Sequence, residues 1–206
     1  MIAFEISQAL IHLVDDDGMV LRALKRLLSA AGYRSMSYGS AEEFLARPNP
    51  DGPGCAVVDL CLPGEDGLNL QSKLMETGIG LPLIFLTGRG DIASTVRAMK
   101  GGAVDFLTKP VEKEALLAAV SKALELDFLA RAARVDIESF ECNLALLTPR
   151  EREVLEGVVA GRLNKQIAAD LNIAEKTIKV HRARVMQKMN VRTTADLVRL
   201  VVMHGS

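Results

Sequence analysis

The chain contains no tryptophan, and aromatic residues make up only 4% of its 206 residues. Its cores must therefore consist mainly of Leu, Val, Ile and Ala. With 49% apolar and 25% charged residues, the composition is that of a folded globular protein and not of a disordered chain. No stretch reaches the roughly 18 uninterrupted apolar residues that a membrane span requires. Glu5 also stands where a signal peptide would carry basic residues. We therefore expect a cytoplasmic protein with no membrane partner.

Cysteine is scarce as well. Cys55, Cys61 and Cys142 are odd in number and have no metal-binding spacing, so we expect three reduced thiols and no disulfide framework.

Length and charge both indicate two domains. A chain of 206 residues is long for one compact domain and sufficient for two. The net charge of -1 conceals an asymmetry, because the segment from Thr148 onward has 11 Lys and Arg against 6 Asp and Glu, whereas the preceding part has 14 against 20. A positive C-terminal part suits an anionic partner, and a negative N-terminal part suits a cation.

Short apolar runs alternate with amphipathic stretches in the first part of the chain. Strands are expected at Ala9–Val14, Tyr33–Tyr38, Cys55–Leu60, Leu83–Leu86 and Val104–Leu107. Helices are expected at Met19–Ala31 with Asp17 as N-cap, after the N-cap Ser40, at Gly67–Thr77, at Ile92–Lys100 and from about Glu112. Five strands alternating with five helices imply an α/β doubly wound fold with a five-stranded parallel sheet. Sites in such folds form at the carboxyl ends of the strands.

The helix from Glu112 meets no proline or glycine for many residues and is predicted to continue to about Arg134. We assign residues 1–125 to the first domain and 126–143 to a linker helix that continues its last helix. The exposed part of this linker either pairs with a second copy or is a solvated helix, because its apolar repeat is too short to decide.

Residues 144–206 are predicted to form a small all-α domain. Thr148-Pro149-Arg150-Glu151 combines an N-cap, an N1 proline and an N3 glutamate, which together indicate a helix start. Four helices are expected, at Pro149–Ala160, Asn164–Leu171, Glu175–Met189 and Thr193–Met203. The second and third have the dimensions of a helix-turn-helix. In the third helix, Ile178, Val185 and Met189 should face inward, and the opposite face carries Lys176, Lys179, Val180, Arg182 and Ala183.

Polar residues gather at the predicted carboxyl ends of the strands. Asp15 and Asp16 follow the first strand, Asp59 ends the third, Thr87 ends the fourth and Lys109 follows the fifth. Three converging carboxylates need a counter-charge, and closely spaced oxygen ligands suit Mg²⁺. A carboxylate nucleophile beside a metal, a hydroxyl and an ammonium describes a site that accepts a phosphoryl group.

Four segments resemble the receiver domain of two-component response regulators of the FixJ type. They are VDDD at Val14–Asp17, DLCLPGEDG at Asp59–Gly67, Thr87–Gly88 and FLTKP at Phe106–Pro110, and the match covers about residues 9–125. The resemblance implies that Asp59 is the phosphoacceptor and that Mg²⁺ or Mn²⁺ is held by Asp15, Asp16, Asp59 and the backbone carbonyl of Cys61. It also implies that Lys109 binds phosphoryl oxygens, that the Lys109-Pro110 peptide is cis, and that Thr87 and Phe106 form the switch.

The segment Leu147–Val198 is similar to the LuxR-type DNA-binding domain of FixJ and NarL regulators. This resemblance implies that Lys179 and Val180 face base edges in the major groove with Arg182 and Ala183 nearby, and that Lys165, Lys176 and Thr177 hold phosphates. His181 is either a contact to the DNA backbone or a packing residue. Two departures are Ala174, where the family often has a capping Ser, and Arg184, which replaces a common Asn and adds a cation near the DNA backbone.

These features together predict a two-component response regulator that acts as a transcription factor. Its expected partners are a sensor histidine kinase, double-stranded promoter DNA and a second copy in a phosphorylation-dependent homodimer, with RNA polymerase as a further candidate. We expect no enzymatic activity beyond phosphoryl acceptance and slow autodephosphorylation at Asp59. The alternatives are a DNA-binding regulator whose receiver is a phosphorylation-independent dimerisation module, and a metal-dependent phosphatase, although Cys61 stands where such enzymes usually carry an acid/base carboxylate. Whether phosphorylation acts through dimerisation or through release of the DNA-binding domain stays open.

Overall fold

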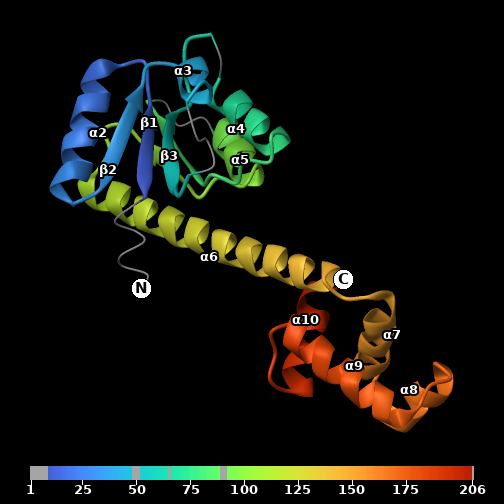
Figure 1. Cartoon of the computed structure of the whole chain (residues 1–206). Coiled ribbons are helices and arrows are strands. Elements are labelled where there is room, and N and C mark those ends of the chain that lie inside the picture. Colours follow the sequence, from blue (N-terminus) through green and yellow to red (C-terminus); the bar gives the residue numbers. More distant parts are fainter. Residues whose placement is uncertain (1–8, 48–51, 65, 89–91, 206) are drawn as a thin grey trace. The chain divides into compact units, whose positions relative to one another are not determined.

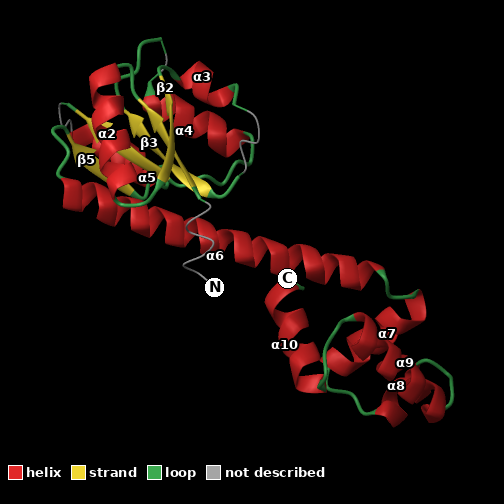
Figure 2. Ribbon diagram, turned by 60° about the vertical axis from the view of Figure 1, so that its left-hand side comes forward, coloured by secondary structure: helices red, strands yellow, loops and turns green. Residues whose placement is uncertain are grey.

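The computed structural model describes residues 9–47, 52–64, 66–88 and 92–205 (Figure 1). The chain separates into two compact units, Met1–Arg131 and Ala132–Ser206. The first is an α/β unit and the second is helical (Figure 2). In the described parts of the chain, no helix is both long enough and apolar enough to cross a membrane.

A five-stranded parallel sheet forms the centre of the first unit. Its strands are β1 (Leu10–Val14), β2 (Arg34–Tyr38), β3 (Gly54–Asp59), β4 (Leu83–Thr87) and β5 (Asp105–Thr108). Their order in the sheet is β2-β1-β3-β4-β5, and every neighbouring pair is parallel. All five predicted strands are confirmed, and no strand end differs from its prediction by more than one residue. The order reverses beside β1, so that β1 and β3 are neighbours and their carboxyl ends meet at the switch point.

Helices cover both faces of the sheet (Figures 1 and 2). The helices are α2 (Gly18–Ala30), α3 (Ala41–Leu45), α4 (Gly67–Glu76), α5 (Ile92–Lys100) and α6 (Lys113–Ala145). One apolar core lies between the sheet and α3, α4 and α5, and it includes Ala56 and Val58 of β3. A second core lies between the sheet and α2 and α6, and it includes Cys55 and Val57 of the same strand. Both faces of β3 are therefore buried, as its continuous apolar sequence requires.

The expected helix starts are confirmed. Asp17 Oδ1 accepts the backbone N–H of Met19 at 2.7 Å, which caps α2. Ser40 Oγ accepts the N–H of Glu43 at 3.2 Å, which caps α3. Each bond satisfies a donor that the first turn of a helix leaves without an intrahelical partner.

Helix α6 extends to Ala145, beyond the end near Arg134 that the apolar pattern predicted and two residues beyond the predicted linker helix of residues 126–143. Its sequence contains neither proline nor glycine. Its last turns also place the buried Phe140 and the partly buried Leu144 in the core of the second unit. Tertiary packing therefore stabilises a continuation that the weak apolar repeat did not indicate.

Asp127 of α6 is 4% exposed and ties the helix to the loop before β3. Its Oδ2 accepts the N–H of Gly54 at 3.0 Å, and both of its oxygens accept the Nε–H of Arg131 at 2.9 Å. Arg131 in turn donates from Nη2 to the carbonyl of Gly52 at 2.8 Å. Glycine is required at position 54 because any side chain there would collide with the carbonyl oxygen of Leu10.

The second unit contains the four expected helices, α7 (Pro149–Val159), α8 (Asn164–Asp170), α9 (Glu175–Lys188) and α10 (Thr194–His204). The predicted capping box of α7 is present, because Glu151 N–H donates to Thr148 Oγ1 at 3.3 Å and Thr148 N–H donates to Glu151 Oε2 at 2.9 Å. Ile178, Val185 and Met189 of α9 are at most 1% exposed, which confirms the predicted inward face. This face fixes which side of α9 is presented to a partner.

Candidate functional site

Three carboxylates converge at the carboxyl ends of β1 and β3. Asp15 and Asp16 follow β1 directly, and Asp59 is the last residue of β3, the strand beside it. Asp15 is 1% exposed and Asp59 6%, whereas Asp16 is exposed. One oxygen from each carboxylate lies within 4.8 Å of those of the other two. The parallel sheet therefore brings together residues that are more than forty positions apart in sequence.

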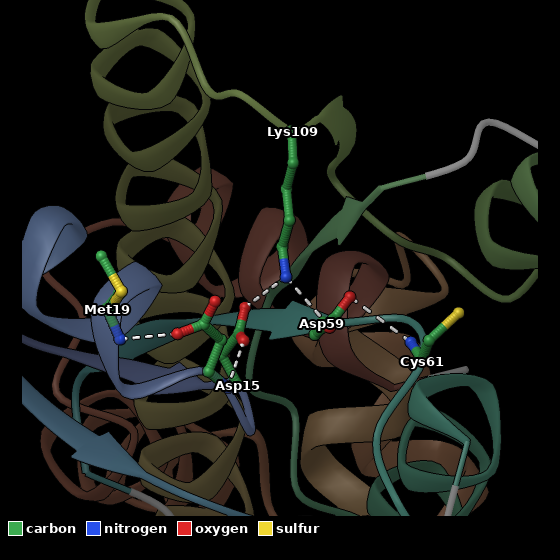
Figure 3. A network of polar contacts seen from close by, with 6 residues as sticks. Asp15, Met19, Asp59, Cys61 and Lys109 are labelled. Atoms are coloured by element: carbon green, nitrogen blue, oxygen red, sulfur yellow. Dashed lines mark hydrogen bonds and ion pairs between the residues drawn. The ribbon is translucent and has the colours of Figure 1, made fainter.

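Lys109 contacts both buried carboxylates and offsets part of their negative charge. Its Nζ lies 2.6 Å from Asp15 Oδ2 and 3.0 Å from Asp59 Oδ2, between the two side chains (Figure 3). Burial alone would lower the pKa of Lys109, but the hydrogen bonds and negative charges of Asp15 and Asp59 outweigh burial and raise it. Burial raises the pKa of Asp15 despite the opposing effect of Lys109. Lys109 therefore stays charged at neutral pH.

Backbone N–H groups orient the same carboxylates. Asp15 Oδ1 accepts the N–H of Asp17 at 2.9 Å, and Asp59 Oδ1 accepts the N–H of Cys61 at 3.4 Å. The Cys61 side chain is exposed, and its sulfur points away from Asp59 (Figure 3). Cys61 therefore offers the pocket its backbone and not its thiol. The position two residues after Asp59 thus carries a thiol and not a carboxylate.

Thr87 and Phe106 come from the two strands on the other side of β3. Thr87 ends β4 and is fully buried, and its carbonyl accepts the N–H of Lys109 at 2.7 Å. Phe106 is partly buried against the core on the α3–α5 side of the sheet and pairs in register with Phe85. The Lys109-Pro110 peptide is cis, as the resemblance implied. The structure thus places Asp15, Asp16, Asp59 and Lys109 in contact range, with Thr87 at the adjoining strand end.

The donor set fits a small divalent cation. Hard cations prefer oxygen ligands, and Mg²⁺ in particular binds through one or two carboxylates while keeping several waters. Asp15, Asp16 and Asp59 provide such oxygens, and the exposure of Asp16 leaves one side of the cluster open to solvent. The single ammonium of Lys109 offsets only part of the three negative charges.

A second candidate site lies on the helical unit, on the side of α9 that faces away from its core. Five of the predicted DNA-contacting residues are exposed there or on α8: Lys165, Lys176, Thr177, Lys179 and Arg184. The Val180 side chain is 46% exposed. Of these cations, Lys179 forms an ion pair of 3.6 Å within its own helix, with the half-exposed Glu175. Such an exposed pair contributes little and leaves Lys179 available to a polyanion.

His181 and Arg182 differ from these exposed residues. His181 is partly buried, and its Nδ1 is enclosed with no hydrogen-bond partner among the described residues. Arg182 donates to Asn164 Oδ1 at 2.7 Å and to Thr194 Oγ1 at 2.9 Å. The sequence alone does not reveal Asn164 and Thr194 as partners of Arg182, because helical periodicity assigns faces to α9 but does not show which neighbouring helix a long side chain reaches. Ala174, as expected, provides no side-chain cap for α9.

Comparisons with known proteins match both units. Residues 11–121 match the family model of the response regulator receiver domain, and residues 145–201 match that of the bacterial regulatory proteins of the luxR family. The chain is 44% identical over 194 residues to nodulation protein W of Bradyrhizobium diazoefficiens, covering 94% of this chain and 86% of that protein. It is 40% identical to the transcriptional regulatory protein FixJ of Rhizobium meliloti, covering 95% and 96%.

Solved structures agree with these matches. The structure of the response regulator StyR is similar with a TM-score of 0.88 at 44% identity, covering 95% of this chain and 98% of that chain. Full-length FixJ from B. japonicum is similar with a TM-score of 0.60 at 37% identity, covering 96% and 97%. The chain therefore belongs to the response regulators that combine a receiver domain with a LuxR-type DNA-binding domain.

Proposed function

We propose that Asp59 accepts a phosphoryl group from the phosphohistidine of a sensor kinase. A carboxylate oxygen of Asp59 attacks phosphorus, the P–N bond to the kinase histidine breaks, and the histidine leaves with its electron pair and takes up a proton. Lys109 Nζ, 3.0 Å from Asp59 Oδ2, lies where it can follow a transferred phosphoryl oxygen. This reaction requires alignment and neutralised oxygen charge, which are the two contributions that these residues make.

Asp15, Asp16, Asp59 and the carbonyl of Cys61 would hold Mg²⁺ or Mn²⁺. A bound divalent cation would neutralise phosphoryl oxygens during transfer. Asp15 contacts Lys109 at 2.6 Å and also belongs to the carboxylate cluster, so cation binding and the Lys109 contact share one side chain. The bound cation and the Lys109 ammonium would then both offset the negative charge of the pocket.

The proposed switch comprises Thr87 and Phe106. Thr87 would move toward the phosphoryl group and Phe106 would change rotamer to fill the vacated space. This movement would alter the face formed by residues 92–123, and with it the contact that this face makes with a second copy. Val96 and Met99 of α5 are each 45% exposed, and apolar side chains on this face suit the phosphorylation-dependent contact of two copies.

Dimerisation would present two α9 helices about 34 Å apart, one turn of DNA. Lys179 and Val180 would face base edges, and Lys165, Lys176, Thr177 and Arg184 would contact phosphates, with His181 beside them. RNA polymerase would be the partner of the DNA-bound dimer. In this proposal residues 1–125 receive the signal, residues 126–143 connect the two domains, and residues 144–206 bind promoter DNA.

The contact of Lys109 with both Asp15 and Asp59, in a cluster that also includes Asp16, is the observation that carries this proposal. The test incubates the full chain with acetyl phosphate and Mg²⁺, and phosphorylation is followed by intact mass. We expect one phosphoryl adduct on the wild type, loss of the adduct in Asp59→Asn and loss on chelation of the metal.

The matched control is Asp17→Asn, a nearby aspartate whose role as helix cap asparagine can also fill. This variant should be phosphorylated like the wild type. An Asp59→Asn chain that still accepts phosphate would contradict the proposal. If dimerisation and promoter binding of the wild-type chain do not change on phosphorylation, the receiver serves only as a dimerisation module.

A further inference from the structure

Arg182 differs from the other cations of α9 because its guanidinium is engaged by two other helices. Nη1 donates to Oδ1 of Asn164, the first residue of α8, at 2.7 Å. Nη2 donates to Oγ1 of Thr194, the first residue of α10, at 2.9 Å. We propose that Arg182 is a positioning residue, which orients the DNA-binding face through Asn164 and Thr194 and does not itself contact DNA. This inference rests on the DNA-binding function proposed above.

The geometry requires an arginine. Its planar guanidinium holds several N–H donors in a fixed fork, so one side chain can donate to two acceptors on different helices at once. The ammonium of a lysine is a single point on a flexible stem and cannot reproduce both bonds. Asn164 and Thr194 are 18 positions before and 12 positions after Arg182, so the fork joins three helices of the domain.

Exposure separates Arg182 from the residues that are suited to contact DNA. The Lys179 side chain is 66% exposed and pairs only within its own helix among the described residues. Arg184, two positions further along α9, is exposed. Arg182 is partly buried, and so is its bond to Asn164, whereas its bond to Thr194 is exposed. Both terminal nitrogens of Arg182 are therefore already engaged by other helices, whereas Lys179 and Arg184 are exposed.

The bond from Arg182 is made at the start of α8. The N-cap of this helix is Leu163, which has no side-chain oxygen to accept an N–H of the first turn, and Gln166 Oε1 accepts the Leu163 N–H at 2.8 Å. Arg182 holds the side chain of Asn164, the first residue of the helix. Lys165, a proposed phosphate contact, is the next residue. Arg182 thus connects the orientation of α9, which would read bases, to that of the residue which would hold the DNA backbone.

The experiment compares Arg182→Met and Arg182→Lys in the full chain. Arg199→Met and Arg199→Lys are matched controls, because they make the same chemical changes on an exposed arginine of the neighbouring helix α10, outside the proposed DNA contacts. The probe is a DNA duplex enriched by the wild-type chain from a random-sequence pool, and affinity is measured over a series of salt concentrations. Circular dichroism melting establishes whether each variant is folded at the temperature of the assay.

We expect both Arg182 variants to bind about tenfold more weakly than the wild type, because lysine restores the charge but not the two bonds. The dependence of log affinity on log salt should keep the wild-type slope, since no phosphate contact is lost. Arg199→Met and Arg199→Lys should bind like the wild type. Asn164→Ala, which removes an acceptor and leaves Arg182 in place, should weaken binding in the same way. The double variant Asn164→Ala/Arg182→Met should be no weaker than Arg182→Met alone.

Four results would overturn the inference. A direct phosphate contact predicts that Arg182→Lys binds like the wild type and that Arg182→Met lowers the salt slope by about 0.9. A direct base contact predicts relaxed preference at a single base pair. Additive losses from Asn164→Ala and Arg182→Met, or unchanged binding by Arg182→Met, would show that the contact does not position the DNA-binding face. Failure of the wild-type chain to enrich any duplex would instead refute the DNA-binding function itself.

Discussion

Neutralising Glu151 should destabilise the DNA-binding unit in a pH-dependent way. Glu151 is 2% exposed, and its Oε2 lies 2.7 Å from Lys188 Nζ at the end of α9 and also accepts the N–H of Thr148. The Lys188 ammonium, followed by the Thr148 N–H, lowers the pKa of Glu151 to about 2 from its ordinary 4.5. Glu151→Gln keeps the size of the side chain and an oxygen for Thr148, so it isolates the loss of charge.

The lowered pKa of Glu151 sets the free energy of unfolding that Glu151→Gln should lose. At about 1.36 kcal/mol per pKa unit, a displacement from 4.5 to about 2 gives an upper limit of about 3 kcal/mol. Because the Lys188 side chain is 32% exposed, solvent screening reduces the expected loss to about 1–2 kcal/mol. A depressed carboxyl pKa stabilises the fold fully above about pH 4.5 and progressively less as the pH falls toward 2.

Urea unfolding of the full chain, followed by far-UV circular dichroism, measures the effect. Peptide-level hydrogen exchange assigns the transition to the second unit. The difference between wild type and Glu151→Gln should be largest at pH 7 and shrink toward pH 3. Glu153→Gln is the matched control, because its ion pair with Arg150 is exposed on both sides and should contribute less than about 1 kcal/mol. A Glu151→Gln loss that equals the control, or that does not change with pH, would refute the reasoning.

Three further outcomes follow from the structure. Gly157→Ala should destabilise the second unit by about 1–3 kcal/mol in the same urea assay, because the new Cβ would lie 2.8 Å from Ile167 Cγ1; unchanged stability would mean that α8 moves aside freely. Lys109→Met should bind Mg²⁺ severalfold more tightly by calorimetry, because the three carboxylates lose their nearest cation; weaker binding would contradict that account. Because burial raises the pKa of Cys55 to about 12, a maleimide at pH 8 should modify only the exposed Cys61 and Cys142 in the folded chain; a third adduct by mass would show that Cys55 is accessible.

The pocket could be predicted from sequence because its residues follow strands. The run at β3 indicated a buried parallel strand, and parallel neighbours bring their carboxyl ends to one edge, so Asp59 and Asp15 had to meet. The sequence did not show which oxygens Lys109 would contact, because side-chain rotamers depend on the packing around them. The inward face of α9 was predictable for a similar reason, since Ile178 and Val185 recur at helical spacing.

The unpredicted features depend on contacts between distant segments. Arg182 was placed on the outer face of α9 by periodicity, but its long side chain reaches back to Asn164. The position of Asp127 in the sequence does carry a signal. It lies four residues after the buried Ala123, on the apolar stripe of α6, and a carboxylate in such a position requires a buried partner. That partner, Gly54, is 73 positions away, so no local pattern could identify it.

The Asp127–Arg131 contact determines where a stable receiver fragment can end. A receiver fragment that ends at residue 125 would leave the Gly54 amide and the Gly52 carbonyl without their helix partners at the foot of the central strand. Extending the fragment by two helical turns, past Arg131, would retain both. An isolated receiver should therefore be cut beyond Arg131, or its stability will understate that of the same fold within the intact chain.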